Sequence, residues 1–301
     1  MRKAKLGNLS ALLAAPTLLA AIAASYTAFW FYNAGAIKSR MADWAAERRA
    51  NGDVANYIVE GVGGFPNRLA LEISGVEVGF RRGETTWSLS ASKLAITSGV
   101  FSPRAFAVEL PDGAEVRRAR ADRADLLRKV GGTARLDFSV DAAEGLRKAD
   151  LTMADLALGG TWGGRPVAPP LKVAEGRVNV TAEPALVTAK NVGGPTARFG
   201  IALRGLRWPD SAAFPLGPEV ASFDLDGEIA GPIKAGTAYD ALQAWREAGG
   251  SVALKRIGLR WGNSALEGTG TLVLDARLQP AASLAARVEG FVPLVDVLDA
   301  A

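Results

Sequence analysis

The sequence predicts a mainly β protein, with an N-terminal transmembrane helix followed by a large antiparallel, bent β-sheet or sandwich domain with a few short helices. Two observations support this class. Residues 6–37 contain no charged residue, and this run exceeds the roughly 20 apolar residues that cross a bilayer as a helix. From residue 53 onward, apolar and polar residues alternate with period two in many segments, as in antiparallel strands that are buried on one face.

The charge-free run contains the predicted anchor. An aromatic cluster at 26–32 is typical of a membrane–water interface, and three basic residues before residue 6 place the N-terminus in the cytoplasm. A cleaved signal peptide is the alternative, with small residues at 23–25 as its cleavage site. The aromatic cluster favours an uncleaved anchor, because cleavage would leave a very apolar new N-terminus. The side chains expected in the membrane are Leu12, Leu13, Leu18, Leu19, Ile22 and Trp30.

The chain is expected to have three parts. The helical spacing of Met41 and Trp44, followed by Asn51-Gly52, predicts a short helix after the anchor. Paired glycines and three prolines near 159–170 predict a loop, and hence a subdivision of the β-rich part. The predicted parts are a cytoplasmic tip and transmembrane anchor at 1–37, a stalk helix at 38–52 and a β-rich domain outside the cytoplasm at 53–301.

The strand predictions rest on alternation and on its interruptions. Leu69, Leu71 and Ile73 alternate with polar or small residues, and the phase moves by one after Gly75. Similar shifts at Gly205 and Gly258 predict bulges or tight turns. Further alternating segments lie at 136–140, 178–180, 223–229 and 272–274. Helices are predicted at 238–248, after Thr237, and at 292–301, and 117–129 fits either a charged helix or an edge strand.

Composition excludes several classes of protein. The chain has no histidine and no cysteine, which removes Ser-His-Asp hydrolysis, the usual zinc sites and disulfides. Its 35 basic and 31 acidic residues become 32 and 31 without Arg2, Lys3 and Lys5. The body is therefore nearly neutral, and we expect no nucleic-acid partner, no cofactor and no enzymatic activity.

One acidic motif and one apolar face are candidate sites. Asp224, Asp226 and Glu228 share a strand face and could hold calcium, although a solvated strand face is favoured because calcium sites usually wrap around a loop. The apolar side of the sheet must be covered by a second sheet, by helices or by a ligand. A closed sandwich and an open lipid-binding groove both satisfy this requirement. The predicted groove residues are Leu69, Leu71, Ile73, Phe199, Ile201 and Leu203.

Two stretches resemble known families. Trp44 and the segment Gly-Gly-Phe-Pro-Asn-Arg-Leu at 63–69 resemble the start of the alphaproteobacterial domain-of-unknown-function 2125 family. Trp261-Gly262 and the residues from 268 to 280 resemble both that family's C-terminal part and the AsmA-like envelope proteins. Ala281-Ala282 depart from the glycine that is usual there, which puts the final turn in doubt. Neither family offers catalytic positions to carry over to this chain.

The resemblance implies a single-pass protein of the bacterial inner membrane with its main domain in the periplasm. AsmA-like proteins are associated with moving phospholipid through an apolar groove. We therefore expect lipid binding or envelope lipid transport and homeostasis, with membrane lipid as the partner. The alternative is a non-catalytic scaffold for another envelope protein, and a histidine-free carboxylate enzyme is a third hypothesis.

Overall fold

The computed structural model describes the backbone of residues 7–141, 145–182, 195–209, 216–231 and 238–290. Side chains are not described for residues 7–21, so those of Leu12, Leu13, Leu18 and Leu19 lie outside the described part. Thr237 and the predicted helix at 292–301 also lie outside it.

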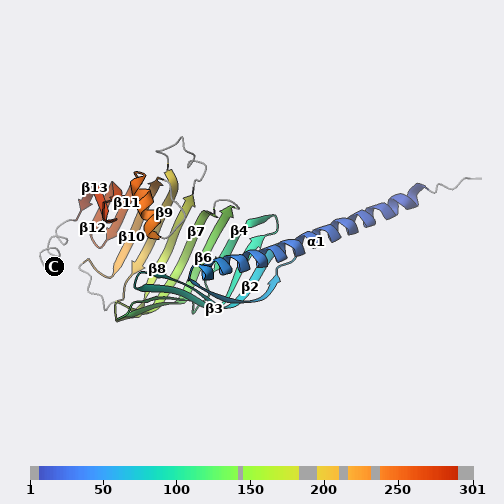
Figure 1. The fold of residues 1–301 in the computed structure, drawn as a ribbon, viewed down its shortest axis with the longest axis horizontal. Helices are drawn as coiled ribbons and strands as arrows, with labels where there is room; N and C mark the ends of the chain where they lie inside the picture. Colours follow the sequence, from blue (N-terminus) through green and yellow to red (C-terminus); the bar gives the residue numbers. More distant parts are fainter. Residues whose placement is uncertain (1–6, 142–144, 183–194, 210–215, 232–237, 291–301) are drawn as a thin grey trace, which may run out of the picture.

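The described residues form two helices and thirteen strands (Figure 1). The helices are α1 (Gly7–Ala50) and α2 (Ala238–Glu247). The strands are β1 (Val54–Gly63), β2 (Arg68–Arg82), β3 (Thr85–Gly99), β4 (Ser102–Glu109), β5 (Glu115–Ala119), β6 (Ala124–Asp141), β7 (Gly145–Trp162), β8 (Arg165–Ala182), β9 (Pro195–Arg207), β10 (Glu219–Ala230), β11 (Ser251–Trp261), β12 (Ser264–Leu274) and β13 (Pro280–Glu289).

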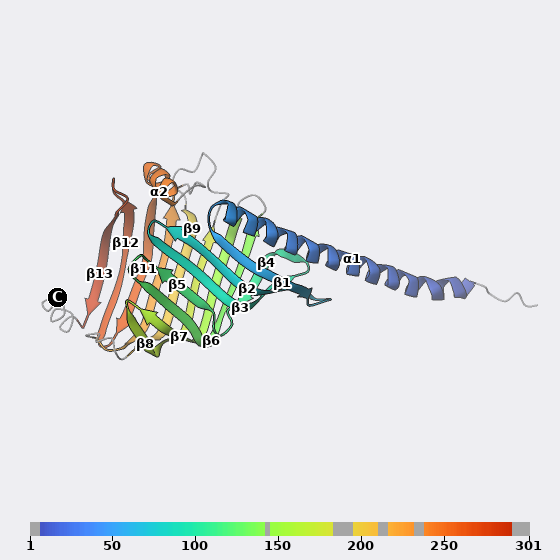
Figure 2. The same cartoon turned by 60° about the horizontal axis from the view of Figure 1, so that its bottom comes forward.

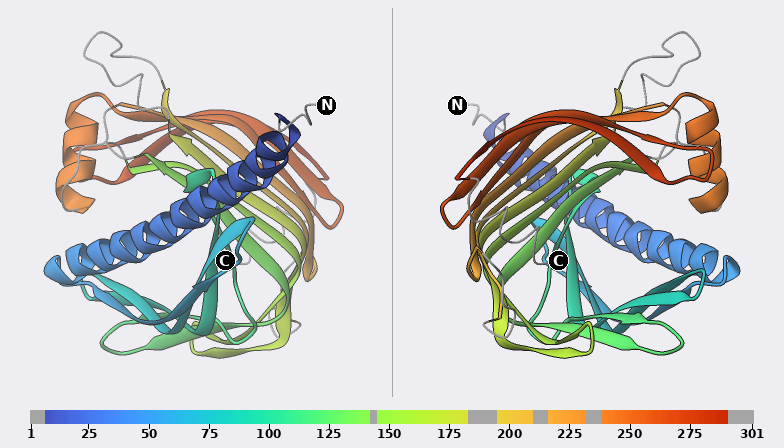
Figure 3. Two further views of the ribbon diagram at one scale, coloured as in Figure 1. Left: turned by 90° about the vertical axis from the view of Figure 1, so that its right-hand side faces the viewer. Right: turned by 90° about the vertical axis from the view of Figure 1, so that its left-hand side faces the viewer.

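All thirteen strands belong to one antiparallel sheet, so the protein is mainly β as predicted, and the sandwich alternative is wrong for the described residues. The strand order follows the chain, except that β4 and β5 share one position between β3 and β6. β4 pairs with the end of β3 near Gly99, and β5 pairs with its beginning. The sheet curls strongly, and the C-terminal part of α1 lies on its concave side (Figure 3).

Directly paired residues share a face of a sheet, and the register shows one apolar face running across it. The row from β2 to β13 consists of Leu71, Ile96, Val108, Leu136, Leu151, Val178, Ile201, Leu225, Ile257, Gly268 and Ala286. We call the side of the sheet that carries this row the apolar face. It crosses β7 and β8 at Leu151 and Val178, which pair directly.

The predicted loop at 159–170 is wrong. Gly163 and Gly164 form a two-residue turn between β7 and β8, with φ angles of 60° and 76°. Two successive residues at positive φ form the hairpin turn whose twist matches that of the flanking strands, and glycine adopts them without strain. The prolines that suggested a loop lie within β8, which pairs with both β7 and β9.

Two of the three predicted irregularities are confirmed. Gly75 and Gly205 have φ angles of 56° and 58°, and the pairing with the neighbouring strand skips each of them. Gly258 instead pairs regularly with Asp224 and Glu267, and the irregularity in β11 lies at Lys255 and Arg256. The ambiguous segment at 117–129 is the β5–β6 hairpin and not a helix.

The helix α1 is continuous across the predicted boundary between anchor and stalk, and its N-terminal part extends away from the sheet (Figure 2). Among the residues with described side chains, no helix combines the length and the apolarity that crossing a membrane requires. The predicted transmembrane helix is therefore not supported by the described residues. Of its predicted membrane residues, Ile22 is exposed and Trp30 is buried.

The predicted helix at 238–248 is confirmed as α2. The Trp245 indole N–H donates to the Ala230 carbonyl at 2.8 Å, which ties α2 to the end of β10. A side chain at Gly250 would collide with the Trp245 ring, because an added Cβ would lie 2.3 Å from it. Close packing at the end of the helix therefore requires glycine at this position.

Candidate functional site: an apolar cavity beneath the N-terminal helix

A cavity of about 420 Å³ lies between α1 and the apolar face of β2, β3, β4 and β6. This volume falls within the range of small-molecule sites. Thirteen apolar side chains and one arginine line the cavity. They are Ile37, Arg40, Met41, Trp44, Leu71, Ile73, Val76, Val78, Leu89, Leu94, Ile96, Phe106, Phe138 and Val140.

The helix presents an apolar stripe to the cavity. Ile37, Met41 and Trp44 follow one another at spacings of four and three residues, which places them on one helix face. Trp30 and Ala34 extend the stripe toward the N-terminus and are buried in the main core cluster. The same helix face therefore closes the core at one end and covers the cavity at the other.

Two hydrogen bonds hold the helix on the sheet. The Trp30 indole N–H donates to the Arg68 carbonyl at 3.0 Å, and the Tyr26 hydroxyl donates to the Pro66 carbonyl. At the cavity, Arg40 donates to the Pro103 carbonyl at 3.2 Å. Because its guanidinium is engaged at the beginning of β4, Arg40 contributes mainly its methylene stem to an otherwise apolar lining.

The six predicted groove residues fall into two separate places. Leu69, Leu71 and Ile73 lie on β2 in the core beneath α1, and the latter two also line the cavity. The other three, Phe199, Ile201 and Leu203, lie on β9 and are half-buried. In the sheet, β9 is separated from β2 by β3, β4, β6, β7 and β8. All six share the apolar face, but the structure does not bring them into one pocket.

The uncovered part of the apolar face continues toward β13. Its inward side chains on β10 and β11 include Phe223, Leu225 and Leu259, which are half-buried. On β13 every residue is exposed, including Leu284 and Val288. Among the described residues, the apolar face is thus covered by a helix only where α1 lies on it, and a second, smaller buried cluster of Ala134, Leu156 and Val173 lies on β6, β7 and β8.

A polar feature lies at the far end of the strands that line the cavity. Arg118 of β5 pairs with buried Asp125 of β6, and its guanidinium carbon lies 4.2 Å from the centre of the Trp162 ring. Asp125 also accepts a hydrogen bond from the Gly163 amide at 2.7 Å. The Arg118 hydrogen bond lowers the pKa of Asp125, so the pair stays charged at neutral pH.

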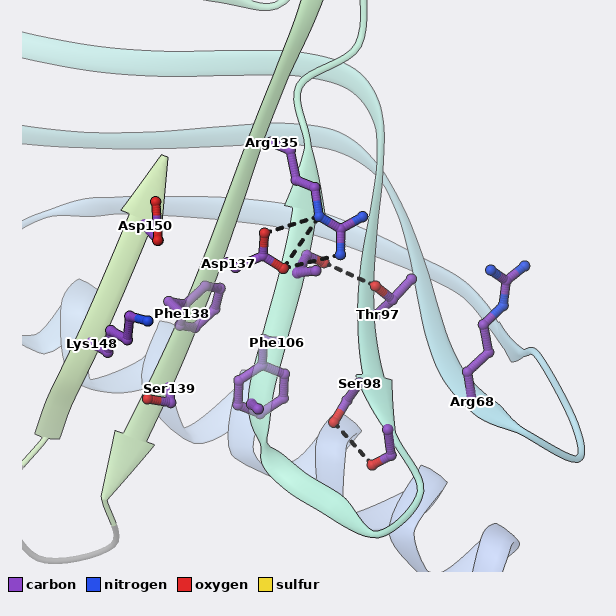
Figure 4. Close-up of a pocket in the computed structure, with 13 residues that line it drawn as sticks. Arg68, Thr97, Ser98, Phe106, Arg135, Asp137, Phe138, Ser139, Lys148 and Asp150 are labelled. Atoms are coloured by element: carbon purple, nitrogen blue, oxygen red, sulfur yellow. Dashed lines mark hydrogen bonds and ion pairs between the residues drawn. The ribbon is translucent and has the colours of Figure 1, made fainter. Parts of the chain in front are cut away.

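A second, larger recess of about 710 Å³ has a mixed lining of charged, hydroxyl and apolar residues and is built on β3, β4, β6 and β7, with Arg68 of β2 (Figure 4). Arg135 donates to Asp137 through Nε and Nη2 at 2.9 and 3.0 Å, and Arg177 donates to Asp150 at 2.9 Å. These contacts lower the pKa of Asp150 and raise that of Arg135. Both shifts favour the charged forms, whereas a carboxylic general acid at neutral pH needs a raised pKa.

The acidic motif Asp224, Asp226 and Glu228 is held in cross-strand ion pairs. Arg204 contacts Asp224 at 2.7 Å, and Arg256 contacts Asp226 at 2.8 Å. Lys255 and Arg198 both contact Glu228 and lower its pKa. No cluster that could hold a metal ion occurs among the described residues, and the three carboxylates form an ion-paired strand face.

Sequence reasoning missed most of the helical side of the cavity. Met41 and Trp44 were recognised as a helical pair, but their continuation through Ile37, Ala34 and Trp30 was assigned to the anchor. The spacing of these residues is the signal that could have found the cavity. Phe106 and Phe138, which stack at 5.3 Å between ring centres, lie on β4 and β6, and only their pairing shows that they meet.

The fold and the cavity define a class of protein with one curled antiparallel sheet whose apolar face is partly covered by an N-terminal helix. The chain belongs to the family described as uncharacterized protein conserved in bacteria (DUF2125), whose sequence profile matches residues 30–301. No curated protein and no solved structure gave a significant match to the chain.

Proposed function

We propose that this protein binds lipid acyl chains on the apolar face of its sheet, first of all in the cavity beneath α1. The observation that carries the proposal is the lining of that cavity, in which Arg40 is the one charged residue among fourteen. A site without convergent polar groups suits a ligand that is recognised by its apolar surface alone. Lipid acyl chains have this chemistry.

The expected binding energy is sufficient without a polar anchor. Each buried methylene contributes about 0.8 kcal/mol, so about ten methylenes contribute about 8 kcal/mol before the costs of association are subtracted. The apolar face beyond the cavity extends the surface available to a longer chain. The apolar face also supports lipid transfer along the sheet, because an acyl chain can move from strand to strand over apolar side chains without contacting a charged one.

The proposal includes a location. The charge-free run at 6–37 would hold the protein at the bacterial inner membrane, with the N-terminus in the cytoplasm and the sheet in the periplasm. The likeness of residues 261–280 to AsmA-like envelope proteins supports a role in envelope lipid transport or homeostasis. In the structure this segment forms the end of β11, β12 and the beginning of β13.

The test measures lipid bound to the full chain purified in detergent. After washing, organic extracts are quantified by mass spectrometry per mole of protein. Leu89→Asp places a charge in the cavity at a partly exposed position, and Val130→Asp is the matched control on an exposed strand position outside it. We expect phospholipid in the wild type and the control, and a loss of at least fivefold in Leu89→Asp. Folded wild-type protein without lipid would refute the proposal.

A scaffold for another envelope protein is the second candidate, and the exposure of β13 favours it. Within the described residues β13 pairs only with β12, so its other edge presents backbone donors and acceptors. Such an edge can accept a strand from a partner. Crosslinking in cells from β13 would then give one dominant protein adduct, whereas lipid binding predicts none.

A further inference from the structure

A group of exposed aromatic side chains surrounds the point where α1 leaves the sheet. Phe101 is 79% exposed, Tyr32 75% and Phe65 52%. Phe29 and Phe31 are also exposed, and Tyr26 contacts the group. We call these six residues the aromatic rim: Tyr26, Phe29, Phe31, Tyr32, Phe65 and Phe101.

Three segments that are distant in sequence build the rim. Tyr26 and Phe29 belong to α1, Phe65 to the β1–β2 turn and Phe101 to the β3–β4 turn. The ring centres of Tyr26 and Phe65 are 6.3 Å apart, and those of Phe29 and Phe101 are 6.1 Å apart. The hydrogen bonds from Tyr26 to Pro66 in the β1–β2 turn and from Trp30 to Arg68 at the start of β2 hold the helix on this end of the sheet.

The rim is an interaction surface by its chemistry. Soluble monomers rarely expose large contiguous apolar patches, and aromatic rings are enriched where a protein meets the headgroup region of a bilayer. The segments 22–41, 63–69 and 98–106 contain no acidic residue, whereas Lys38, Arg40, Arg68 and Arg104 are basic. Aromatic rings beside basic residues fit a membrane surface that contains anionic lipid.

The rim also lies next to the cavity. Ile37, the first helical residue of the cavity lining, follows Tyr32 by five residues, which is about 7.5 Å along a helix. The charge-free run continues from the rim in the opposite direction. The rim therefore lies along α1 between the charge-free run on one side and the cavity on the other. A bilayer surface at the rim would bring lipid close to the cavity.

We infer that the aromatic rim docks this end of the sheet onto the surface of a bilayer, with Phe65 and Phe101 inserting beside α1. Phe65 and Phe101 lie in turns of the sheet and not on α1. Their insertion would fix the orientation of the sheet relative to the membrane, which a helical anchor alone does not do. This orientation presents the cavity to the lipid. The inference is independent of whether the cavity itself retains lipid, so either can fail alone.

The absence of cysteine from the chain allows a clean test. Phe101→Cys and Phe65→Cys are each labelled with a polarity-sensitive fluorophore in the full chain and reconstituted into vesicles of phosphatidylcholine and phosphatidylglycerol. Leu284→Cys is the control, because Leu284 is exposed on β13 at the other end of the sheet. Circular dichroism checks that all three variants keep the β-sheet signal.

In the reconstituted vesicles we expect the labels at 65 and 101 to emit at shorter wavelength than the label at 284, and to be quenched at least threefold less by aqueous iodide. Nitroxide-labelled lipid should quench the first two labels and not the control. Equal iodide quenching at 101 and 284, or equal emission wavelengths at the two positions, would overturn the inference. Protection of 101 in cells but not in vesicles would indicate a protein partner and would also overturn it.

Discussion

Replacement of Trp30 tests whether α1 packs on the sheet in the way that creates the cavity. Trp30 is 3% exposed and lies against Phe31 and Phe65 with ring centres 5.1 and 5.6 Å away. A buried aromatic side chain removes about 150–250 Å² from water, which corresponds to about 4–6 kcal/mol. Measured costs of Trp→Ala in cores are about 3–5 kcal/mol, and we expect Trp30→Ala to lower the free energy of unfolding by this amount.

Trp30→Phe separates burial from hydrogen bonding. The ring area is largely retained, but the Arg68 carbonyl loses its donor, so the expected loss is about 1–2 kcal/mol. Tyr32→Ala is the control on the same helix, because Tyr32 is exposed and its removal should change stability by less than about 0.5 kcal/mol. Urea unfolding of the full chain in detergent, followed by circular dichroism, measures all three. A cost below about 1 kcal/mol for Trp30→Ala would refute the described packing.

Two further predictions concern the sheet. An added Cβ at Gly132, whose φ is 75°, would lie 2.1 Å from the Asp155 carbonyl oxygen, so Gly132→Ala should cost more than about 2 kcal/mol in urea unfolding. Gly131→Ala meets only Ala157 at 3.9 Å and should cost less than about 1 kcal/mol; equal effects would contradict the close approach of Gly132 to Asp155. The carboxyls of Asp125 and Asp150 have lowered pKa values in the folded state, because Arg118 and Arg177 donate hydrogen bonds to them. As pH falls below about 4, the unfolded state takes up protons first, so the stability from these pairs is present above this pH and is lost below it. When the pH is lowered from about 6 to about 3, the urea concentration at the midpoint of unfolding should decrease, and it should decrease less in Asp150→Asn. Equal acid sensitivity of the variant and the wild type would contradict this reasoning.

The strands were predictable because their side-chain period is local. The alternation of Leu69, Leu71 and Ile73 and the shift at Gly75 are visible in a few consecutive residues, and the structure confirms both. Gly163 and Gly164 were misread because paired glycines occur in loops and in tight hairpin turns alike. A strand on each side of the glycine pair indicates a hairpin turn and not a loop. The prolines of β8 obscured the strand that follows Gly163 and Gly164.

The arrangement of the strands was not predictable from alternation. An apolar face can be covered by a second sheet or by a helix, and Leu71 shows the same local pattern in both cases. The structure decides for a helix, because Trp30 and Ile37 pack against β2 from a segment that sequence reasoning assigned to an anchor. Phe65 and Phe101 each contact Tyr26 in the aromatic rim, and these contacts depend on two turns more than 30 residues apart.

The central claim is that the apolar face, and not the opposite face, contacts lipid. Ile96 and Thr97 are neighbours on β3 and therefore lie on opposite faces of the sheet; the first lines the apolar cavity and the second lines the mixed recess. A photoreactive amino acid is placed at each position in the full chain, irradiated in cells, and the adduct is identified by mass spectrometry. We predict a phospholipid adduct at position 96 and none at position 97. Equal lipid labelling at both positions, or a protein adduct alone at 96, would contradict the claim.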